Sequence, residues 1–115
     1  MIEVALIGHG YWGTKLARNF QNLELFNLSA IVDLKTQNLK VAKKNYPLAE
    51  LSNNYKKIIK DSLIDLVIIS TPTSTHFDIA RYALENSKHI LVEKPLSLSL
   101  SEVKTLYKIA NKKKK

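Results

Sequence analysis

The stretch GHGYWG at residues 8–13 decides the fold of this chain. It is a G-x-G-x-x-G pattern, and it contains all three glycines of the 115-residue sequence. The apolar run Ile2–Ile7 comes directly before it, and the amphipathic stretch Tyr11–Gln21 begins within it. A glycine turn between a strand and a helix lets the backbone approach a diphosphate, whose negative charge the helix N-terminus attracts. The pattern therefore predicts a dinucleotide-binding turn.

Each glycine of this turn has a separate predicted task, and one acid completes the site. Gly8 permits the tight turn, Gly10 lets the backbone approach the diphosphate, and Gly13 lets the helix lie close to the sheet. Asp33 lies twenty residues beyond Gly13, where an acid accepts hydrogen bonds from the adenosine ribose. Its charge favours NAD, although nearby Lys35 leaves NADP possible. One alternative is that the glycines only form a turn and that Asp33 only ends a strand. Another is an S-adenosylmethionine site, which the two-residue spacing before Gly13 disfavours.

Short apolar runs alternate with amphipathic stretches along the chain, a rhythm typical of parallel α/β sheets. The sequence predicts one α/β domain, a Rossmann-type doubly wound parallel sheet of about five strands with helices on both faces. The expected strands are residues 2–7, 28–32, 48–51, 66–69 and 90–92, and the expected helices are residues 11–21, 39–45, 55–60, 75–86 and 99 onward. Capping boxes are predicted at residues 75–78 and 99–102.

Composition excludes several classes of protein. There is no cysteine, so disulfides and thiolate metal sites are excluded, and no metal site is predicted. No apolar run is long enough to cross a bilayer, and the first residues carry no basic signal region. A cytoplasmic protein without membrane contact is therefore expected. The net charge of +8 includes the four lysines at 112–115, which are expected to form a frayed tail rather than a nucleic-acid-binding arm.

Three motifs together resemble one known family. They are GHGYWG at residues 8–13, STPTSTH at residues 70–76 and EKP at residues 93–95. In this order and at these separations they are similar to the N-terminal domain of the glucose–fructose oxidoreductase/inositol dehydrogenase (Gfo/Idh/MocA) family. The resemblance implies an NAD(P)-binding Rossmann domain over residues 1–111, with residues 112–115 as a basic tail.

The resemblance also implies roles for the residues that follow the last two strands. Thr71 and Pro72 are expected to border the cofactor riboses, and Glu93, Lys94 and Pro95 to lie beside the nicotinamide. In this family the lysine of the last motif faces the reaction centre, so Lys94 is the expected catalytic residue. A lysine at the carboxyl end of a parallel strand can orient a substrate hydroxyl or help to move its proton. The alternative is a solvated surface lysine.

The remaining candidate cofactor contacts lie inside the first two motifs. His9 stands between two glycines and is expected to approach the cofactor. Tyr11 and Trp12 are expected at the rim beside the phosphates, as packing residues rather than chemical participants. For His76 a local structural role is favoured over cofactor contact, because it lies in the predicted first turn of a helix.

Three functions compete on the sequence alone. The favoured one is the cofactor-binding half of an oxidoreductase that acts on a sugar, sugar nucleotide or polyol. The substrate-binding domain of the family is missing, so little turnover by this chain alone is expected. The second is a non-catalytic nucleotide-sensing module, and the third a basic nucleic-acid-binding protein. The last strand, at residues 90–92, would form an open sheet edge, through which copies of the chain could associate.

Overall fold

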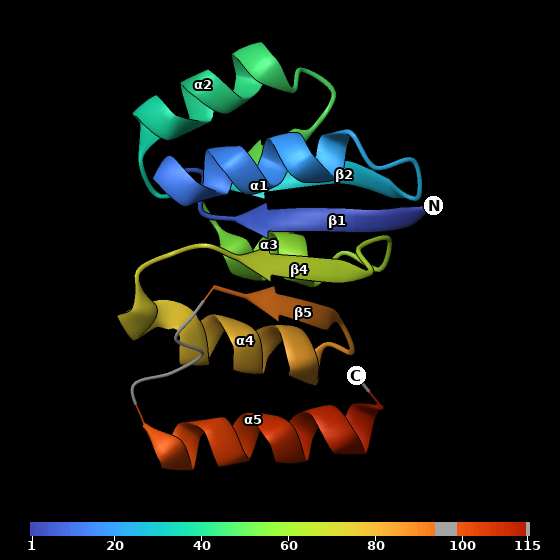
Figure 1. The fold of residues 1–115 in the computed structure, drawn as a ribbon, viewed down its shortest axis with the longest axis vertical. Helices are drawn as coiled ribbons and strands as arrows, with labels where there is room; N and C mark the ends of the chain where they lie inside the picture. The colour runs from blue at the N-terminus through green and yellow to red at the C-terminus, as the bar shows by residue number, and fades with distance from the viewer. Residues whose placement is uncertain (94–98, 115) are drawn as a thin grey trace.

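Five strands form one parallel sheet, in the order β3-β2-β1-β4-β5. The computed structural model describes residues 1–93 and 99–114 (Figure 1). The strands are β1 (Ile2–Ile7), β2 (Phe26–Val32), β3 (Glu50–Ser52), β4 (Leu66–Ile69) and β5 (His89–Val92). The order reverses between β1 and β4, because the chain builds outward on one side of β1 and then crosses to the other. The predicted doubly wound parallel sheet is confirmed.

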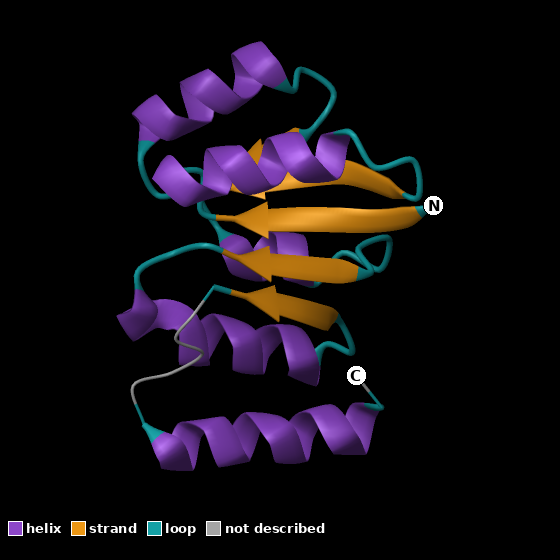
Figure 2. Cartoon of the chain, in the orientation of Figure 1, coloured by secondary structure: helices purple, strands orange, loops and turns teal. Residues whose placement is uncertain are grey.

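Helices cover both faces of this sheet, as predicted (Figure 2). They are α1 (Tyr11–Gln21), α2 (Thr36–Asn45), α3 (Tyr55–Ile59), α4 (His76–Glu85) and α5 (Leu100–Lys113), with a short 3₁₀ turn at Thr73–Thr75. Helices α1 and α2 contribute to the core on one face. Helices α3, α4 and α5 contribute to the core on the other, where α5 lies against α4.

Strand β1 shows why its sequence forms a central strand. Its side chains alternate between the two cores, Val4 and Leu6 in one and Ala5 and Ile7 in the other. All four are 0–2% exposed, because helices cover the sheet on both sides. A strand buried on both faces is continuously apolar, which is the pattern of residues 4–7, while Glu3 lies near the less buried amino end of the strand. The burial of these side chains fixes β1 in the sheet. The glycine turn follows directly at the carboxyl end of β1.

Of the two predicted capping boxes, the first is wrong and the second is supported. The Thr75 side chain does not cap α4, because its hydroxyl donates to the Pro72 carbonyl at 2.6 Å and lies 2.6 Å from the Thr71 hydroxyl. The Thr75 hydroxyl is therefore bonded within the preceding 3₁₀ turn and does not accept from a backbone N–H of α4, as a capping box requires. At the other site, the Ser99 hydroxyl accepts from the Glu102 backbone N–H at 3.4 Å and begins α5.

Strand β5 and helix α5 are the last two elements of the described chain. Strand β5 is an edge strand with β4 as its one neighbour, as predicted. Helix α5 continues through Lys113, in agreement with a predicted helix that runs into the lysine tail, and the described lysines of the tail are exposed. Lys114 then ends the helix in the left-handed conformation. None of the helices in the described residues is both long and apolar enough to cross a membrane.

Candidate cofactor site

The first residue beyond each of four strands lies at one edge of the sheet. Each donates its backbone N–H to the carbonyl oxygen of the last residue of a neighbouring strand, at 2.7–3.1 Å. These pairs are Gly8 to Val32, Asp33 to Ser52, Ser70 to Ile7, and Glu93 to Ile69. The parallel ladder thus extends one residue past the strands and brings three sequence motifs and Asp33 together. Open α/β sheets bind ligands at this carboxyl edge, where the strand order reverses.

The glycine turn is built from close backbone contacts that no side chain could enter. Gly8 has φ +100°, and a Cβ added there would lie 2.5 Å from the Ser70 carbonyl oxygen. A Cβ at Gly13 would collide with the Gly8 carbonyl oxygen. The first finding agrees with the tight turn predicted for Gly8. The second agrees with the close approach of α1 predicted for Gly13.

Gly10 differs from the other two glycines because its missing side chain faces open space. A Cβ built there meets no atom within 4 Å. Gly10 is also the N-cap residue of α1, where no side chain caps the helix and no acid occupies the first turn. The first N–H groups of α1 therefore keep their hydrogen-bonding capacity beside an open space, an arrangement that suits a phosphate. On these observations the turn fits the diphosphate of a dinucleotide.

Asp33 is turned toward the glycine turn. Its Oδ2 accepts hydrogen bonds from the His9 backbone N–H at 2.8 Å and from the Asn38 side-chain amide at 3.0 Å. Its Oδ1 accepts from the Lys35 backbone N–H at 2.8 Å. The carboxylate is half-buried and held from both sides. Sequence reasoning missed Asn38, although an amide five residues after the acid, in the first turns of the next helix, was a usable signal.

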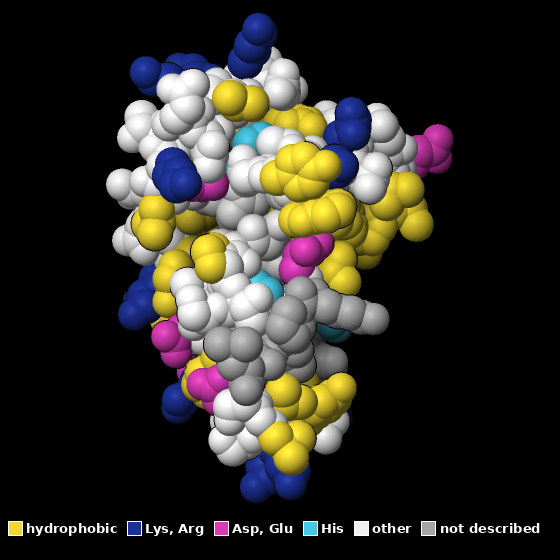
Figure 3. All heavy atoms as spheres, turned by 60° about the vertical axis from the view of Figure 1, so that its left-hand side comes forward, with side chains coloured by type: hydrophobic (Ala, Val, Ile, Leu, Met, Phe, Trp, Pro, Cys, Tyr) yellow, Lys and Arg dark blue, Asp and Glu magenta, His cyan; other side chains and the backbone are white. Residues whose placement is uncertain are grey.

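A cleft of about 460 Å³ runs from the glycine turn past Asp33 to the start of α4. Its lining residues include Gly8, Gly10, Asp33, Asn38, Asn53, Tyr55, Thr71, Pro72, Thr75 and Asp78. Figure 3 brings this end of the sheet toward the viewer, with hydrophobic and acidic side chains visible on it. Predicted positions from the first two motifs therefore share one cleft. Asn53 and Tyr55 were not predicted as site residues, because no motif marks them, and Asp78 was marked only as the acid of the predicted capping box.

The His9 side chain lies in the core beside the cleft, so the predicted approach of His9 to the cofactor stays a prediction for its backbone. The ring is 1% exposed, does not line the cleft, and contacts Tyr46 edge-on at 6.1 Å between ring centroids. Within residues 1–93 and 99–114, neither ring nitrogen has a hydrogen-bond partner. Burial lowers the pKa of His9, and the Asp33 carboxylate opposes that shift with a smaller effect. The backbone N–H of His9, rather than its ring, contributes to the site geometry.

His76 has the local structural role that the sequence favoured. It is 1% exposed, and its Nε2 lies 2.8 Å from the Thr71 carbonyl oxygen. Thr71 and Pro72 line the cleft, whereas His76 does not. The imidazole therefore holds the loop after β4 through this contact. A direct contact between His76 and the cofactor stays a prediction.

Tyr11 and Trp12 lie at the start of α1 and outside the cleft lining. Their side chains are 70% and 56% exposed and pack edge-to-face, with ring centroids 5.1 Å apart. The Lys15 ammonium lies over both rings, 4.4 Å from the Tyr11 centroid and 5.0 Å from that of Trp12. The pair thus forms an exposed aromatic surface beside the turn, in agreement with a packing role.

The third motif is only partly described. Glu93 is half-buried at the carboxyl end of β5, one residue beyond the strand. Lys94 and Pro95 lie outside the described residues, so the predicted catalytic lysine has no structural account here.

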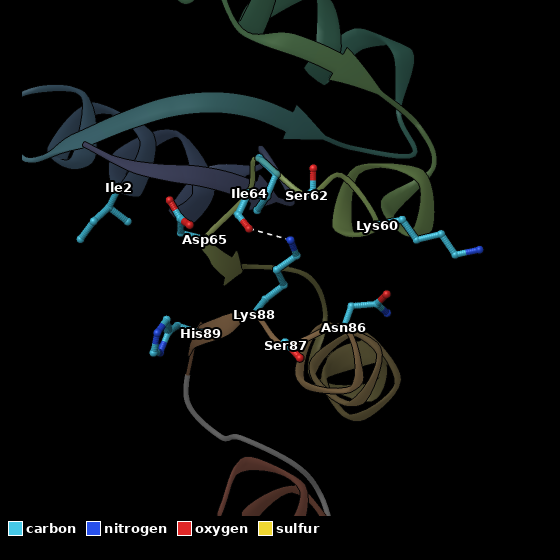
Figure 4. Close-up of a pocket in the computed structure, with 9 residues that line it drawn as sticks. All are labelled: Ile2, Lys60, Ser62, Ile64, Asp65, Asn86, Ser87, Lys88 and His89. Carbon is cyan, nitrogen blue, oxygen red and sulfur yellow. Dashed lines mark hydrogen bonds between the residues drawn. The ribbon is translucent and has the colours of Figure 1, made fainter. Parts of the chain in front are cut away.

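A larger cavity, of about 690 Å³, lies at the opposite edge of the sheet (Figure 4). It is lined by residues at the amino ends of β4 and β5, and Lys88 is its buried cation. The Lys88 ammonium donates to the backbone carbonyls of Asp61 at 2.8 Å and Ile64 at 2.6 Å. This lysine therefore stabilises the turn before β4. The candidate cofactor site is the cleft at the carboxyl ends of the strands, where open α/β sheets bind ligands. The larger cavity has no glycine turn and lies at the amino ends of the strands.

A family model described as "Oxidoreductase family, NAD-binding Rossmann fold" (GFO_IDH_MocA) matches residues 2–115. The chain belongs to this family. The resemblance drawn from the three motifs is confirmed, and with it the NAD(P)-binding Rossmann class of the domain. Relatives of this Gfo/Idh/MocA chain include enzymes named for either cofactor, NAD⁺ or NADP⁺.

This Gfo/Idh/MocA chain is similar to one part of several longer proteins. It is 34% identical over 113 residues to the uncharacterized oxidoreductase YdgJ of Escherichia coli, covering 95% of this chain and 31% of that protein. It is 29% identical over 102 residues to the myo-inositol 2-dehydrogenase of Thermotoga maritima, covering 89% and 30%. The structure of biliverdin reductase from Synechocystis superposes with a TM-score of 0.94 at 28% identity, covering 99% and 36%. The chain spans about a third of the length of these relatives.

Proposed function

We propose that this chain is the cofactor-binding part of an NAD(P)-dependent oxidoreductase that acts on a sugar, sugar nucleotide or polyol. The observation that carries the proposal is the open space at Gly10 beside the Asp33 carboxylate, at the edge where the strand order reverses. The names of relatives support the substrate class, since they include myo-inositol and scyllo-inositol dehydrogenases.

In this proposal the cleft holds the adenosine and diphosphate parts of the cofactor. The backbone at Gly8, Gly10 and Gly13 and the first N–H groups of α1 receive the diphosphate. Asp33 accepts hydrogen bonds from the adenosine ribose, and its negative charge repels the 2′-phosphate of NADP. NAD is therefore the proposed preference. Thr71 and Pro72 border the riboses from the opposite wall of the cleft.

The reacting end of the cofactor is assigned to the third motif. Bound nicotinamide would supply hydride transfer to or from a carbinol carbon of the substrate. Glu93, Lys94 and Pro95 are proposed to lie beside it, an assignment that rests on the family motif. A Lys94 ammonium there would orient the substrate hydroxyl or take part in moving its proton. Lys94 is the proposed catalytic residue.

We expect this chain alone to bind cofactor with little turnover. The residues that define its cleft serve the dinucleotide, and no sugar-binding group is identified among the described residues. The place of β5 at the edge of the described sheet supports a second proposal, that copies of the chain associate through it, because an edge strand can pair with a strand of another chain. Replacement of exposed Leu91 by lysine should then shift the oligomeric state toward the monomer in light scattering. The proposed compartment is the cytoplasm.

Titration calorimetry with NAD, NADH and NADP tests the cofactor assignment. Saturable 1:1 binding is expected, with NAD and NADH bound more tightly than NADP. Asp33→Ala should abolish that order of affinities, whereas Asp61→Asn should not, since Asp61 lies in the turn before β4 and outside the cleft. Failure of all three dinucleotides to bind would overturn the proposal. Binding, followed by no turnover of any sugar or polyol when the chain is joined to a relative's remaining sequence, would favour a sensing module.

A further inference from the structure

The lining of the cleft includes three polar side chains that the site description has not used. They are Asn53 in the loop after β3, Tyr55 at the start of α3, and Asp78 in the first turn of α4. Two separate segments, the β3–α3 connection and the start of α4, thus contribute polar groups to the cleft. Such convergence of polar groups on an otherwise apolar cleft is typical of the part of a site that fixes ligand orientation.

Asp78 differs from the other acid of the cleft in how its carboxylate is used. Asp33 accepts three hydrogen bonds from the protein. Asp78 is exposed, and within the described part of the chain its carboxylate has neither a hydrogen bond nor an ion pair. It lies close enough to Tyr55 to raise the pKa of that phenol, in addition to the effect of burial. The Asp78 oxygens therefore keep their full capacity to accept hydrogen bonds from a ligand.

The order of groups along the cleft indicates which part of a dinucleotide meets Asp78. The diphosphate belongs at Gly10 and the ribose at Asp33, so the purine base belongs beyond Asp33 toward α4. Adenine carries an amino group at C6, which donates hydrogen bonds. Hypoxanthine carries an oxygen at the same position, which only accepts them. A carboxylate has no proton to offer at neutral pH, so where it faces the C6 substituent it attracts the amino group and repels the oxo oxygen; only at N1, which is protonated in hypoxanthine, would it meet a donor of the 6-oxopurine.

We propose that Asp78 determines the base specificity of this site, by accepting a hydrogen bond from the C6 amino group of adenine and disfavouring a 6-oxopurine. The inference rests on the proposed function, because it takes the cleft to hold an adenine dinucleotide. Asn53 and Tyr55 flank the same base, but each can both donate and accept hydrogen bonds, so neither separates the two purines as sharply. Asp78 is a specificity residue and takes no part in hydride transfer.

The competing explanation is that Asp78 only stabilises α4. An acid in the first turn interacts favourably with the helix dipole wherever it occurs. That role would make Asp78 important for folding but indifferent to the base. The two explanations therefore differ in one measurable ratio, the affinity for NAD divided by the affinity for its hypoxanthine analogue.

The test uses titration calorimetry with NAD and with nicotinamide hypoxanthine dinucleotide on the full chain. The wild type should bind NAD about tenfold more tightly or better, since a hydrogen bond to a charged group is at stake. Asp78→Asn should bring the two affinities to within about threefold, because the amide can turn to donate to the 6-oxo group. Asp78→Ala, which removes both charge and acceptor, should also abolish the preference.

Glu85→Gln is the matched control, since it removes the same charge from the same helix at an exposed residue outside the cleft. It should retain the full preference for NAD, and thermal unfolding should show that all three variants are folded. Equal affinities in the wild type, or an unchanged preference in both Asp78 variants, would overturn this inference and leave the proposed function standing. If neither dinucleotide binds the wild type, the proposed function itself falls, and this inference with it.

Discussion

The Asp33 carboxylate accepts a hydrogen bond from the His9 backbone N–H at 2.8 Å, across 24 residues of sequence. This bond joins the segment after β2 to the glycine turn after β1. The acid proposed to hold the ribose and the turn proposed to hold the diphosphate are therefore fixed relative to each other before any cofactor binds. A substitution at Asp33 consequently affects both parts of the site.

Asp33→Asn separates the charge of this residue from its shape. The amide oxygen can still accept from His9, so the turn should keep its geometry, while the repulsion of a 2′-phosphate is lost. We expect the ratio of NAD to NADP affinity to fall by about tenfold, because roughly 1.4 kcal/mol of discrimination is removed. Competition calorimetry measures the ratio. An unchanged ratio would show that Asp33 does not face the 2′ position.

Gly10→Ala and Gly8→Ala form a pair that separates binding from folding. At Gly10 a methyl group meets nothing, so the free energy of unfolding should change by no more than about 0.5 kcal/mol. Cofactor affinity should nevertheless fall, because the methyl group occupies the space proposed for the diphosphate. At Gly8 the positive φ and the contact with Ser70 should lower the free energy of unfolding by roughly 2–4 kcal/mol.

Urea denaturation measures the stability of both glycine variants, and calorimetry measures NAD binding. Full NAD affinity in Gly10→Ala would contradict the assignment of the diphosphate to this turn. A Gly8→Ala protein as stable as the wild type would contradict the backbone conformation described for the turn.

The buried His9 ring predicts a pH dependence of stability. Burial lowers its pKa below the ordinary value of about 6.5. The unfolded chain therefore binds a proton at a higher pH than the folded chain does. The free energy of unfolding should fall as the pH drops below about 6.5, by at most about 1.4 kcal/mol per pH unit, until the folded protein also becomes protonated.

Replacement of His9 by leucine should remove this part of the pH dependence, and it should also remove two buried ring nitrogens that lack partners. Urea denaturation between about pH 5 and pH 7 compares the slopes. His89→Gln serves as control, since that histidine is exposed at the start of β5. Equal slopes in the wild type and the leucine variant would refute a lowered pKa at His9.

His76→Leu tests whether the imidazole positions the loop after β4. The Thr71 carbonyl loses its 2.8 Å partner, which should lower the free energy of unfolding by about 1–3 kcal/mol. NAD affinity should fall as well, because Thr71 and Pro72 line the cleft. His76→Gln can restore a donor and should recover part of both losses. Recovery of neither by glutamine would assign the effect to packing alone.

The strands and helices could be predicted wherever the side-chain pattern is imposed by burial on both faces of the sheet. Residues 66–69 are continuously apolar, and residues 2–7 are apolar apart from Glu3, because helices cover both sides of the sheet; both strands were predicted with their observed bounds. Strand β2 begins at Phe26, two residues before its predicted start. Its first residue pairs with Ile2 at the beginning of β1, a contact between strands that no local pattern reveals.

The site was predictable where backbone geometry dictates the residue type, and less so where tertiary contacts decide. The need for a missing Cβ marks Gly8 and Gly13 in the sequence. Thr75 has the residue type of a cap, but the loop after β4 brings Thr71 and Pro72 to its hydroxyl first. The local pattern marked Asp78 only as a helix-capping acid, because its place in the cleft depends on how α4 packs beside α3.

The contacts of Gly8 with Ser70 and Gly13 have one consequence for how a ligand would be received. Three backbone segments touch there without intervening side chains, so the turn has few alternative conformations to lose on binding. A preorganised receptor of this kind requires little ordering entropy from its ligand. Association should then proceed in a single kinetic phase, with no slow isomerisation after encounter.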